Sequence, residues 1–274
     1  YGYTGHHTGR TKHGDWNTYY QFMNNQLTEL LTNYGPVGAI WFDGVWDHWE
    51  VDKNFDWRLG EQYALIHKLQ PACLIGNNHH RAPIEGEDFQ MFERDLPGEN
   101  KAGFSATSEV GRLPLETCET MNGMWGYRVK DQNYKSVPTL VRLLVRAAGK
   151  GANLLLNIGP QPNGELPALA LDRLKGMGEW MDKYGETVYG TTRGGVESAE
   201  WGTTTRKGNK LYVHILADAM PSFITLPLQE RVKHAALFDG GAKVKTERID
   251  GGVVLHTKDL KPDTDCIVVL TLAD

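Results

Sequence analysis

Apolar and polar positions follow two different patterns along the chain. Between residues 16 and 184, stretches with apolar residues at helical spacing alternate with short runs that are apolar throughout. The helical stretches are residues 16–33, 56–69, 137–148 and 166–184, and the apolar runs are residues 37–42, 73–76 and 153–158. Short apolar runs between helices are typical of a parallel sheet with both faces covered, so an α/β fold is predicted here.

Beyond residue 190 the pattern becomes one of short runs separated by glycine, aspartate and asparagine. The predicted strands are residues 210–216, 222–226, 235–238, 252–256 and 266–272. Such short, regularly punctuated strands are typical of an antiparallel sandwich. We therefore predict two domains, part of a (β/α) barrel at residues 1–190 and an all-β antiparallel sandwich at residues 191–274.

The composition narrows the class of protein. The chain has 274 residues, a net charge of −5, 40% hydrophobic and 23% charged residues, which is the balance of a soluble globular protein. No apolar run is long enough to cross a membrane, and the mild acidity argues against nucleic acid or an anionic membrane as a partner. The three cysteines form no C-x-x-C pair, so neither a disulfide framework nor a zinc site is predicted. We expect no metal and no cofactor.

Asp43 is the most informative polar residue because it directly follows an apolar run and precedes Gly44. In a parallel barrel the carboxyl ends of the strands hold the catalytic groups. Trp41 and Trp46 flank Asp43, and such rings pack on the apolar face of a sugar while a carboxylate attacks the anomeric carbon. The same position also suits a simple turn formed with Gly44.

A glycoside hydrolase needs a second carboxyl group, and residues 85–119 are crowded with candidates. The acids in this stretch are Glu85, Glu87, Asp88, Glu93, Asp95, Glu99, Glu109, Glu116 and Glu119. Spacing alone does not choose among them. Arg81 could orient a carboxylate or a sugar hydroxyl, Trp125 could line a pocket, and no spacing completes a metal site around His79 and His80.

Five segments resemble family 29 α-L-fucosidases. Residues 26–44 resemble the nucleophile segment of that family, and residues 87–97, 115–127, 151–164 and 179–189 resemble later motifs in the same order. The resemblance is strong over residues 13–192 and rests on position and pattern beyond them. It implies a (β/α) TIM-type barrel followed by a β-sandwich, and hydrolysis of terminal α-L-fucosides with retention of configuration.

The resemblance also implies roles for individual residues. Asp43 matches the catalytic nucleophile, and Glu93 is our choice for the acid/base, followed by Glu99 and then Glu116. The remaining positions that resemble the family's site are Trp41, Trp46 and Trp125 around the sugar ring, Arg81 at a fucose contact, and Asp88 behind the site. Retention predicts carboxyl groups about 5–5.5 Å apart.

The chain departs from the family in one respect: the N-terminal half of the barrel, with its adjacent histidines, has no counterpart. A complete barrel typically takes about 250 residues, against about 190 predicted here. We therefore expect a second fragment or chain to supply the missing strands, and a fucosylated oligosaccharide as substrate. Two alternatives remain, a retaining glycosidase for another sugar such as an α-galactoside, and a carbohydrate-binding fragment without turnover.

The cellular compartment is an expectation from the family alone. Residues 1–7 show no secretion signal, having neither a basic nor an apolar segment. Members of the family are typically secreted, periplasmic or lysosomal.

Overall fold

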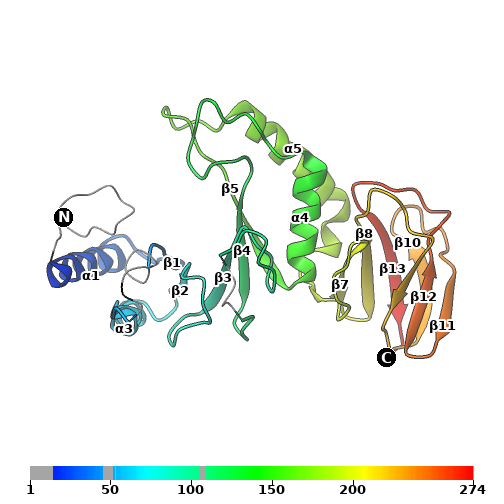
Figure 1. The fold of residues 1–274 in the computed structure, drawn as a ribbon, viewed down its shortest axis with the longest axis horizontal. Coiled ribbons are helices and arrows are strands. Elements are labelled where there is room, and N and C mark those ends of the chain that lie inside the picture. Colours follow the sequence, from blue (N-terminus) through cyan, green and yellow to red (C-terminus); the bar gives the residue numbers. More distant parts are fainter. Residues whose placement is uncertain (1–14, 46–51, 53, 105–108, 274) are drawn as a thin grey trace. The chain divides into compact units, whose positions relative to one another are not determined.

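The computed structural model describes residues 15–45, 52, 54–104 and 109–273 (Figure 1). The chain divides into two compact units, residues 1–116 and residues 117–274, which are described separately below. The division into a barrel portion at residues 1–190 and a sandwich at residues 191–274 stays a prediction. Within the described ranges, none of the helices is both long and apolar enough to cross a bilayer.

The described part of the first unit contains helices packed on a parallel sheet. Its elements are α1 (Trp16–Asn33), β1 (Ala39–Phe42), α3 (Leu59–Leu69), β2 (Leu74–Asn77), β3 (Phe89–Glu93) and the first residues of β4 (Leu115–Thr120). β1, β2 and β3 pair in that order and run parallel. Asp15 caps the first helix, because its side chain accepts a hydrogen bond of 2.8 Å from the backbone nitrogen of Thr18.

The two faces of β1 and β2 differ in burial. Side chains on one face form a core with the helices, whose buried members are Leu27, Leu31, Phe42, Val45, Leu59, Tyr63, Ile66, Cys73 and Ile75. Alternation along a strand puts Trp41 on the face opposite Phe42, and Leu74 on the face opposite Ile75. Trp41 is 38% and Leu74 50% exposed. The sheet is therefore covered by helices on one side and open on the other within the first unit.

The second helix begins later than its apolar spacing predicts, at Leu59 rather than at residue 56. Arg58, directly before it, has a left-handed backbone with φ of 54°. The side chain of Asp56 accepts a 2.8 Å hydrogen bond from the Arg58 backbone nitrogen, which forms a turn that competes with a helical start.

The second unit begins within β4 and continues with helices and antiparallel sheets. The helical part comprises α4 (Val137–Gly149), β5 (Ala152–Asn157), α5 (Ala168–Tyr184) and the 3₁₀-helix η1 (Gly185–Thr187). The strands that follow are β6 (Thr192–Arg193), β7 (Gly202–Lys207), β8 (Lys210–Ile215), β9 (Phe223–Leu226), β10 (Val232–Leu237), β11 (Thr246–Ile249), β12 (Gly252–His256) and β13 (Cys266–Leu272). β4 and β5 are neighbours in the strand order, as the 3.0 Å bond from the Met121 nitrogen to the Asn157 oxygen shows just beyond β4.

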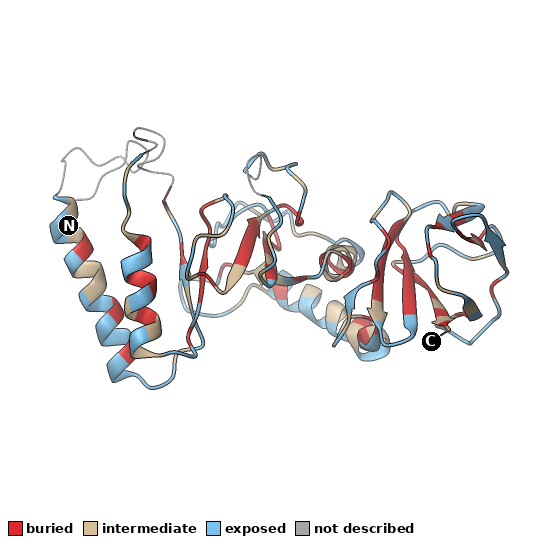
Figure 2. Cartoon of the chain, turned by 90° about the horizontal axis from the view of Figure 1, so that it is seen from below, coloured by how far each residue is buried: buried red, intermediate tan, exposed pale blue. Residues whose placement is uncertain are grey.

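The C-terminal strands form two antiparallel sheets with a shared core, which confirms the predicted sandwich. One sheet has the order β10-β13-β8-β7-β6 and the other the order β11-β12-β9. Residues buried between them come from both sheets, among them Val213, Val268, Leu226 and Leu255. Figure 2 shows buried residues along the strands of this C-terminal region.

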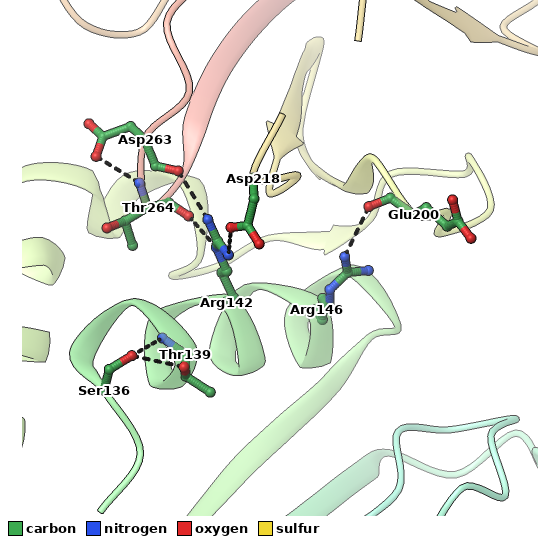
Figure 3. A network of polar contacts seen from close by, with 8 residues as sticks. All are labelled: Ser136, Thr139, Arg142, Arg146, Glu200, Asp218, Asp263 and Thr264. Carbon is green, nitrogen blue, oxygen red and sulfur yellow. Dashed lines mark hydrogen bonds and ion pairs between the residues drawn. The ribbon is translucent and has the colours of Figure 1, made fainter. Parts of the chain in front are cut away.

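Two arginines attach α4 to the loops of the sandwich (Figure 3). Arg142 donates to the backbone oxygen of Thr264 at 3.0 Å, to that of Asp263 at 3.3 Å and to the carboxylate of Asp218 at 2.7 Å. One turn further along, Arg146 donates to the backbone oxygen of Ala199 at 3.2 Å. The planar guanidinium of Arg142 thus satisfies acceptors on two loops, which a lysine could not do in this geometry.

We expect Arg142→Ala to lower the free energy of unfolding of the second unit by about 1–2 kcal/mol, because backbone acceptors lose a charged donor. Midpoints of urea unfolding would measure the loss. Asp218→Ala is the matched control: it removes only a carboxylate that is 90% exposed, so a change of about 0–1 kcal/mol is expected. Equal losses in the two variants would contradict a role for the backbone contacts.

Candidate active site

Three parallel strands end beside one another and carry polar residues at their ends. In β1 and β2, Phe42 lies opposite Asn77, so the next residues, Asp43 and Asn78, leave the sheet at the same edge. β3 runs parallel to β2 and ends at Glu93. Carboxyl ends of parallel strands are where α/β proteins place functional side chains.

A single amide nitrogen connects the two carboxylates. Asn78 Nδ2 donates to Glu93 Oε2 at 2.8 Å and to Asp43 Oδ1 at 3.2 Å. Because these contacts share one nitrogen atom, the two carboxylate oxygens lie at most 6.0 Å apart. One oxygen of Asp43 and one of Glu93 are thus held near each other, as two carboxyl groups that act on one glycosidic bond require.

The environment of Asp43 opposes its ionisation. Partial burial of the carboxyl raises its pKa, the hydrogen bond from Asn78 lowers it, and the negative charge of Glu93 raises it further. The net result is a pKa above the ordinary value of an aspartate. A carboxylate that is accessible yet poorly hydrated is a better nucleophile than one solvated by bulk water.

Asn78, which the sequence did not single out, is the most firmly held of the three residues. It is 2% exposed, and its backbone nitrogen donates to the Phe42 oxygen at 2.9 Å. Its Oδ1 atom is buried and accepts no hydrogen bond from the residues that the structure describes. The signal was present in the sequence, since Asn78 follows the apolar run 73–76 at nearly the same offset as Asp43 follows its own.

A buried polar network fixes the loop that follows β2. Glu87 accepts hydrogen bonds of 2.9 Å from the hydroxyl of Tyr63 and from Nε2 of His79, and the Tyr63 hydroxyl accepts one of 2.8 Å from Asn77. The backbone nitrogen of Arg81 donates to His79 Nδ1, so His79 is neutral and carries its proton on Nε2. Burial and the charge of Glu87 raise the pKa of Tyr63. Glu87 is thus a structural carboxylate.

His80 lies beside Glu93. Its Nε2 is 3.5 Å from Glu93 Oε2, and its ring lies 5.3 Å from that of Phe104 between centroids. Burial lowers the pKa of His80, an effect that Glu93 opposes and His79 strengthens. His80 has a φ of 58°, a left-handed conformation that is uncommon for residues other than glycine.

Trp41 connects β1 to a third carboxyl group. Its Nε1 donates to Glu116 Oε1 at 3.4 Å, and both residues belong to the first unit. Burial raises the pKa of Glu116, and the hydrogen bond from Trp41 lowers it. Glu116 therefore lies across the sheet face from β1, with a partly desolvated carboxyl.

The other predicted site residues are placed as follows. Glu99, in the loop after β3, pairs with Lys101 at 2.8 Å, and Arg81 lies in the loop after β2 with an exposed side chain. Asp88 Oδ2 accepts a 2.8 Å hydrogen bond from the backbone nitrogen of Ile75 on β2. The same oxygen lies 3.0 Å from Nε2 of His67 on α3, so Asp88 connects β2 to α3. Trp125 belongs to the second unit, where its backbone oxygen accepts from Asn157 at 2.6 Å. Trp46 lies outside the described residues.

A metal centre finds no support in the part of the chain that the structure describes. No group of three or more histidine, cysteine, aspartate or glutamate side chains is arranged there to hold a metal ion. At the strand ends, the described residues include the Asp43 and Glu93 carboxylates and the Asn78 amide between them.

Comparison with known proteins places the chain in a family. The sequence model of the family described as alpha-L-fucosidase matches residues 2–186, more than half of the chain. Plasma alpha-L-fucosidase of Rattus norvegicus is 39% identical over 179 residues, which are 61% of this chain and 35% of that protein. The chain spans between 31% and 42% of the length of the curated relatives that it matches.

Solved structures share the fold. Alpha-L-fucosidase isoenzyme 1 from Paenibacillus thiaminolyticus superposes with a TM-score of 0.73 at 34% identity, over 97% of this chain and 65% of that one. A GH29 alpha-L-fucosidase from Bacteroides thetaiotaomicron, solved as a trapped covalent intermediate with 2-fluoro-fucosyl fluoride, has a TM-score of 0.75 at 24% identity, over 94% of this chain and 62% of that one. That second likeness is evidence of the fold alone. From the family match and the 34% identical structure together, this chain belongs to the α-L-fucosidase family, glycoside hydrolase family 29.

Proposed function

We propose that this chain carries the two catalytic carboxylates of a retaining exo-α-L-fucosidase, with Asp43 as nucleophile and Glu93 as acid/base. The observation that carries the proposal is the pair of hydrogen bonds from Asn78 Nδ2, at 3.2 and 2.8 Å, which keep the two carboxylates close together. Membership of the family supplies the substrate class, a terminal α-L-fucoside.

In the first step of the proposed reaction, an Asp43 oxygen bonds to the anomeric carbon while the bond to the leaving oxygen breaks. Glu93 gives its proton to that oxygen, so the alcohol leaves neutral and Glu93 becomes ionised. In the second step Glu93 removes a proton from water, whose oxygen bonds to the anomeric carbon as the ester to Asp43 breaks. Fucose is released with its configuration retained, and both carboxyl groups return to their starting states.

A panel of nitrophenyl glycosides tests the substrate class and the two rival functions. Release of nitrophenol from the α-L-fucoside alone supports the proposal. Release from the α-galactoside instead would favour a retaining glycosidase for another sugar. Binding of fucose, measured by calorimetry, without any release would favour a carbohydrate-binding fragment.

Glu93→Ala tests the acid/base assignment. We expect turnover of a fucoside with a poor leaving group to fall about 10²–10⁴-fold, because no acid protonates the departing oxygen. With an activated aryl leaving group the first step should be largely restored, and azide should then speed the second step, since azide needs no general base. Formation of fucosyl azide is measured by mass spectrometry.

Glu99→Ala and Glu116→Ala are the matched comparisons for this experiment. Glu99 is already paired with Lys101, and the Glu116 carboxyl is hydrogen-bonded by Trp41, so neither variant should respond to azide. Azide rescue in one of these variants, with none in Glu93→Ala, would move the acid/base role to that residue.

We further propose that strands supplied by another segment or chain complete the barrel. The exposure of Trp41 and Leu74 on the open face of the sheet supports this, because barrel interiors are filled by packed side chains. Mass spectrometry of the purified native protein would show whether a second polypeptide accompanies this one. The expected secreted, periplasmic or lysosomal setting is likewise a proposal.

A further inference from the structure

Asn78 has a position that a purely structural asparagine would not need. Its side chain directs a single nitrogen, with its two N–H groups, at two carboxylates on neighbouring strands. The reverse orientation of the amide would set its oxygen against both carboxylates, so their charges determine which way the amide faces. The Oδ1 atom is left buried without a donor among the described residues. Asn77 Oδ1, on the adjacent residue, is buried without a partner among the described residues in the same way, so the two nitrogen contacts are what distinguish Asn78.

We infer that Asn78 is a positioning residue that supplies a hydrogen bond to whichever of Asp43 and Glu93 carries the negative charge. The inference rests on the proposed function, because it is the double displacement that moves the charge. Before the first step the charge is on Asp43. Once Asp43 is esterified and Glu93 has lost its proton, the charge is on Glu93, and the other N–H group of the same nitrogen already points at it.

A neutral amide suits this task better than a charged side chain would. An arginine or lysine between the two carboxylates would hold both in their ionised forms, and Glu93 could not then act as an acid. An amide keeps both of its protons in every state, so it contributes a hydrogen bond without adding charge. The backbone bond to Phe42 and the 2% exposure of Asn78 fix the nitrogen while the charge moves.

Three other titratable groups among the described residues bear on this role, namely His80, Glu116 and Arg81. His80 contacts Glu93 at 3.5 Å, and burial lowers its pKa, so it adds little positive charge at neutral pH. The Glu116 carboxyl on β4 is hydrogen-bonded by Trp41. Arg81 lies three residues after Asn78 in the same loop.

Carboxyl titrations followed by carbon-13 NMR test the inference without requiring turnover. In Glu93→Gln, adding Asn78→Ala should move the titration midpoint of Asp43 upward, because the ionised form loses a donor. In Asp43→Asn, which imitates the neutral esterified state, adding Asn78→Ala should move the midpoint of Glu93 upward. A shift in both backgrounds is the expected result. A shift in only one, or in neither, would overturn the charge-following role.

Asn77→Ala is the matched control. Asn77 is the adjacent buried asparagine, 3% exposed, and its amide donates to the Tyr63 hydroxyl instead of to Asp43 or Glu93. It should disturb packing to a similar degree yet move neither midpoint. Should Asn78→Ala not fold, Asn78→Ser replaces it: one hydroxyl donor serves one carboxylate at a time, so upward shifts smaller than those from alanine are expected in both backgrounds.

Activity measurements separate failure of this inference from failure of the proposed function. If the chain hydrolyses 4-nitrophenyl α-L-fucoside, Asn78→Ala should lose about 10- to 100-fold in both steps, resolved by burst kinetics, as expected for a hydrogen bond to a charged group. Turnover by the native chain with unmoved midpoints in Asn78→Ala would overturn the inference alone. Shifted midpoints without any turnover by the native chain would overturn the proposed function and leave the bridging contacts standing.

Discussion

Asp43→Asn is expected to reduce hydrolysis of 4-nitrophenyl α-L-fucoside by about 10⁴-fold or more, because an amide in place of the proposed nucleophile cannot form the covalent intermediate. The amide is nearly the same size as the carboxylate, and Asn78 still lies beside it. The loss should appear in kcat and not in KM, since sugar-binding groups are unchanged. Full activity in this variant would exclude Asp43 as nucleophile.

The folded state should not suffer from this substitution. The pKa of Asp43 is raised in the folded protein, so at neutral pH its ionised form is less favourable there than in the unfolded chain. Replacing it with a neutral amide removes that penalty, and the melting temperature should stay equal or rise. Asp172→Asn, at an exposed pair with Arg173 on α5, is the control that should alter neither activity nor melting.

The same raised pKa predicts the acid side of the pH profile. Asp43 must be ionised to attack, and protonation as the pH falls through its pKa removes the nucleophile. The acid limb of kcat/KM should therefore lie above the ordinary pKa of an aspartate. A limb at or below that value would contradict the desolvation of Asp43.

The local pattern was sufficient to place Asp43 at the end of a strand, although the same position also suits a turn with Gly44. An apolar run must be buried, and the first polar residue after it must leave the sheet. The same reasoning succeeded for α1, whose predicted bounds are those of the structure. Local spacing is sufficient for both the strand end at Asp43 and the helix α1, because neither depends on residues far away in the sequence.

β3 and β4 escaped prediction because their residues are mixed in character. β3 reads FQMFE and β4 LETCET, so neither is apolar throughout, and both lie within a stretch crowded with acids. Gln90 is a polar residue buried inside β3, where its side chain is paired with the backbone of Glu109 and Gly111. Pairing of that kind comes from distant parts of the chain and leaves no local pattern.

Asn78 was missed for a related reason. Carboxylates and histidines are candidates for catalysis by their residue type alone, whereas an asparagine at a strand end indicates only a turn. Its importance comes from strand register, which sets Phe42 opposite Asn77 and so aligns the two strand ends. A sequence shows where strands end, but the pairing that brings Asn78 between Asp43 and Glu93 belongs to the folded chain.

Asp265→Ala is expected to lower the free energy of unfolding of the second unit by about 3–5 kcal/mol. Asp265 Oδ2 lies 2.7 Å from Nδ1 of His214, and both side chains are fully buried. The Thr205 hydroxyl gives its proton to the Thr187 backbone oxygen at 2.6 Å, so it must accept from His214 Nε2 at 3.0 Å. Nε2 thus has Thr205 as its partner and Nδ1 has Asp265, so removing Asp265 leaves Nδ1 buried without its hydrogen-bond partner.

Comparing Asp265→Ala with Asp265→Asn shows whether a missing hydrogen bond or a cavity causes the loss of stability. Asp265→Asn should lose less than Asp265→Ala, because its amide can donate to Nδ1 of a neutral His214 that keeps its proton on Nε2. Urea unfolding followed by the fluorescence of Trp201, which packs against the sandwich core, measures each loss. Equal losses for the two variants would show that cavity formation dominates and that the proton-sharing pair contributes little. A larger loss for alanine establishes His214 and Asp265 as a pair that is stable only when both groups are present, because a buried imidazole has no water to replace its partner.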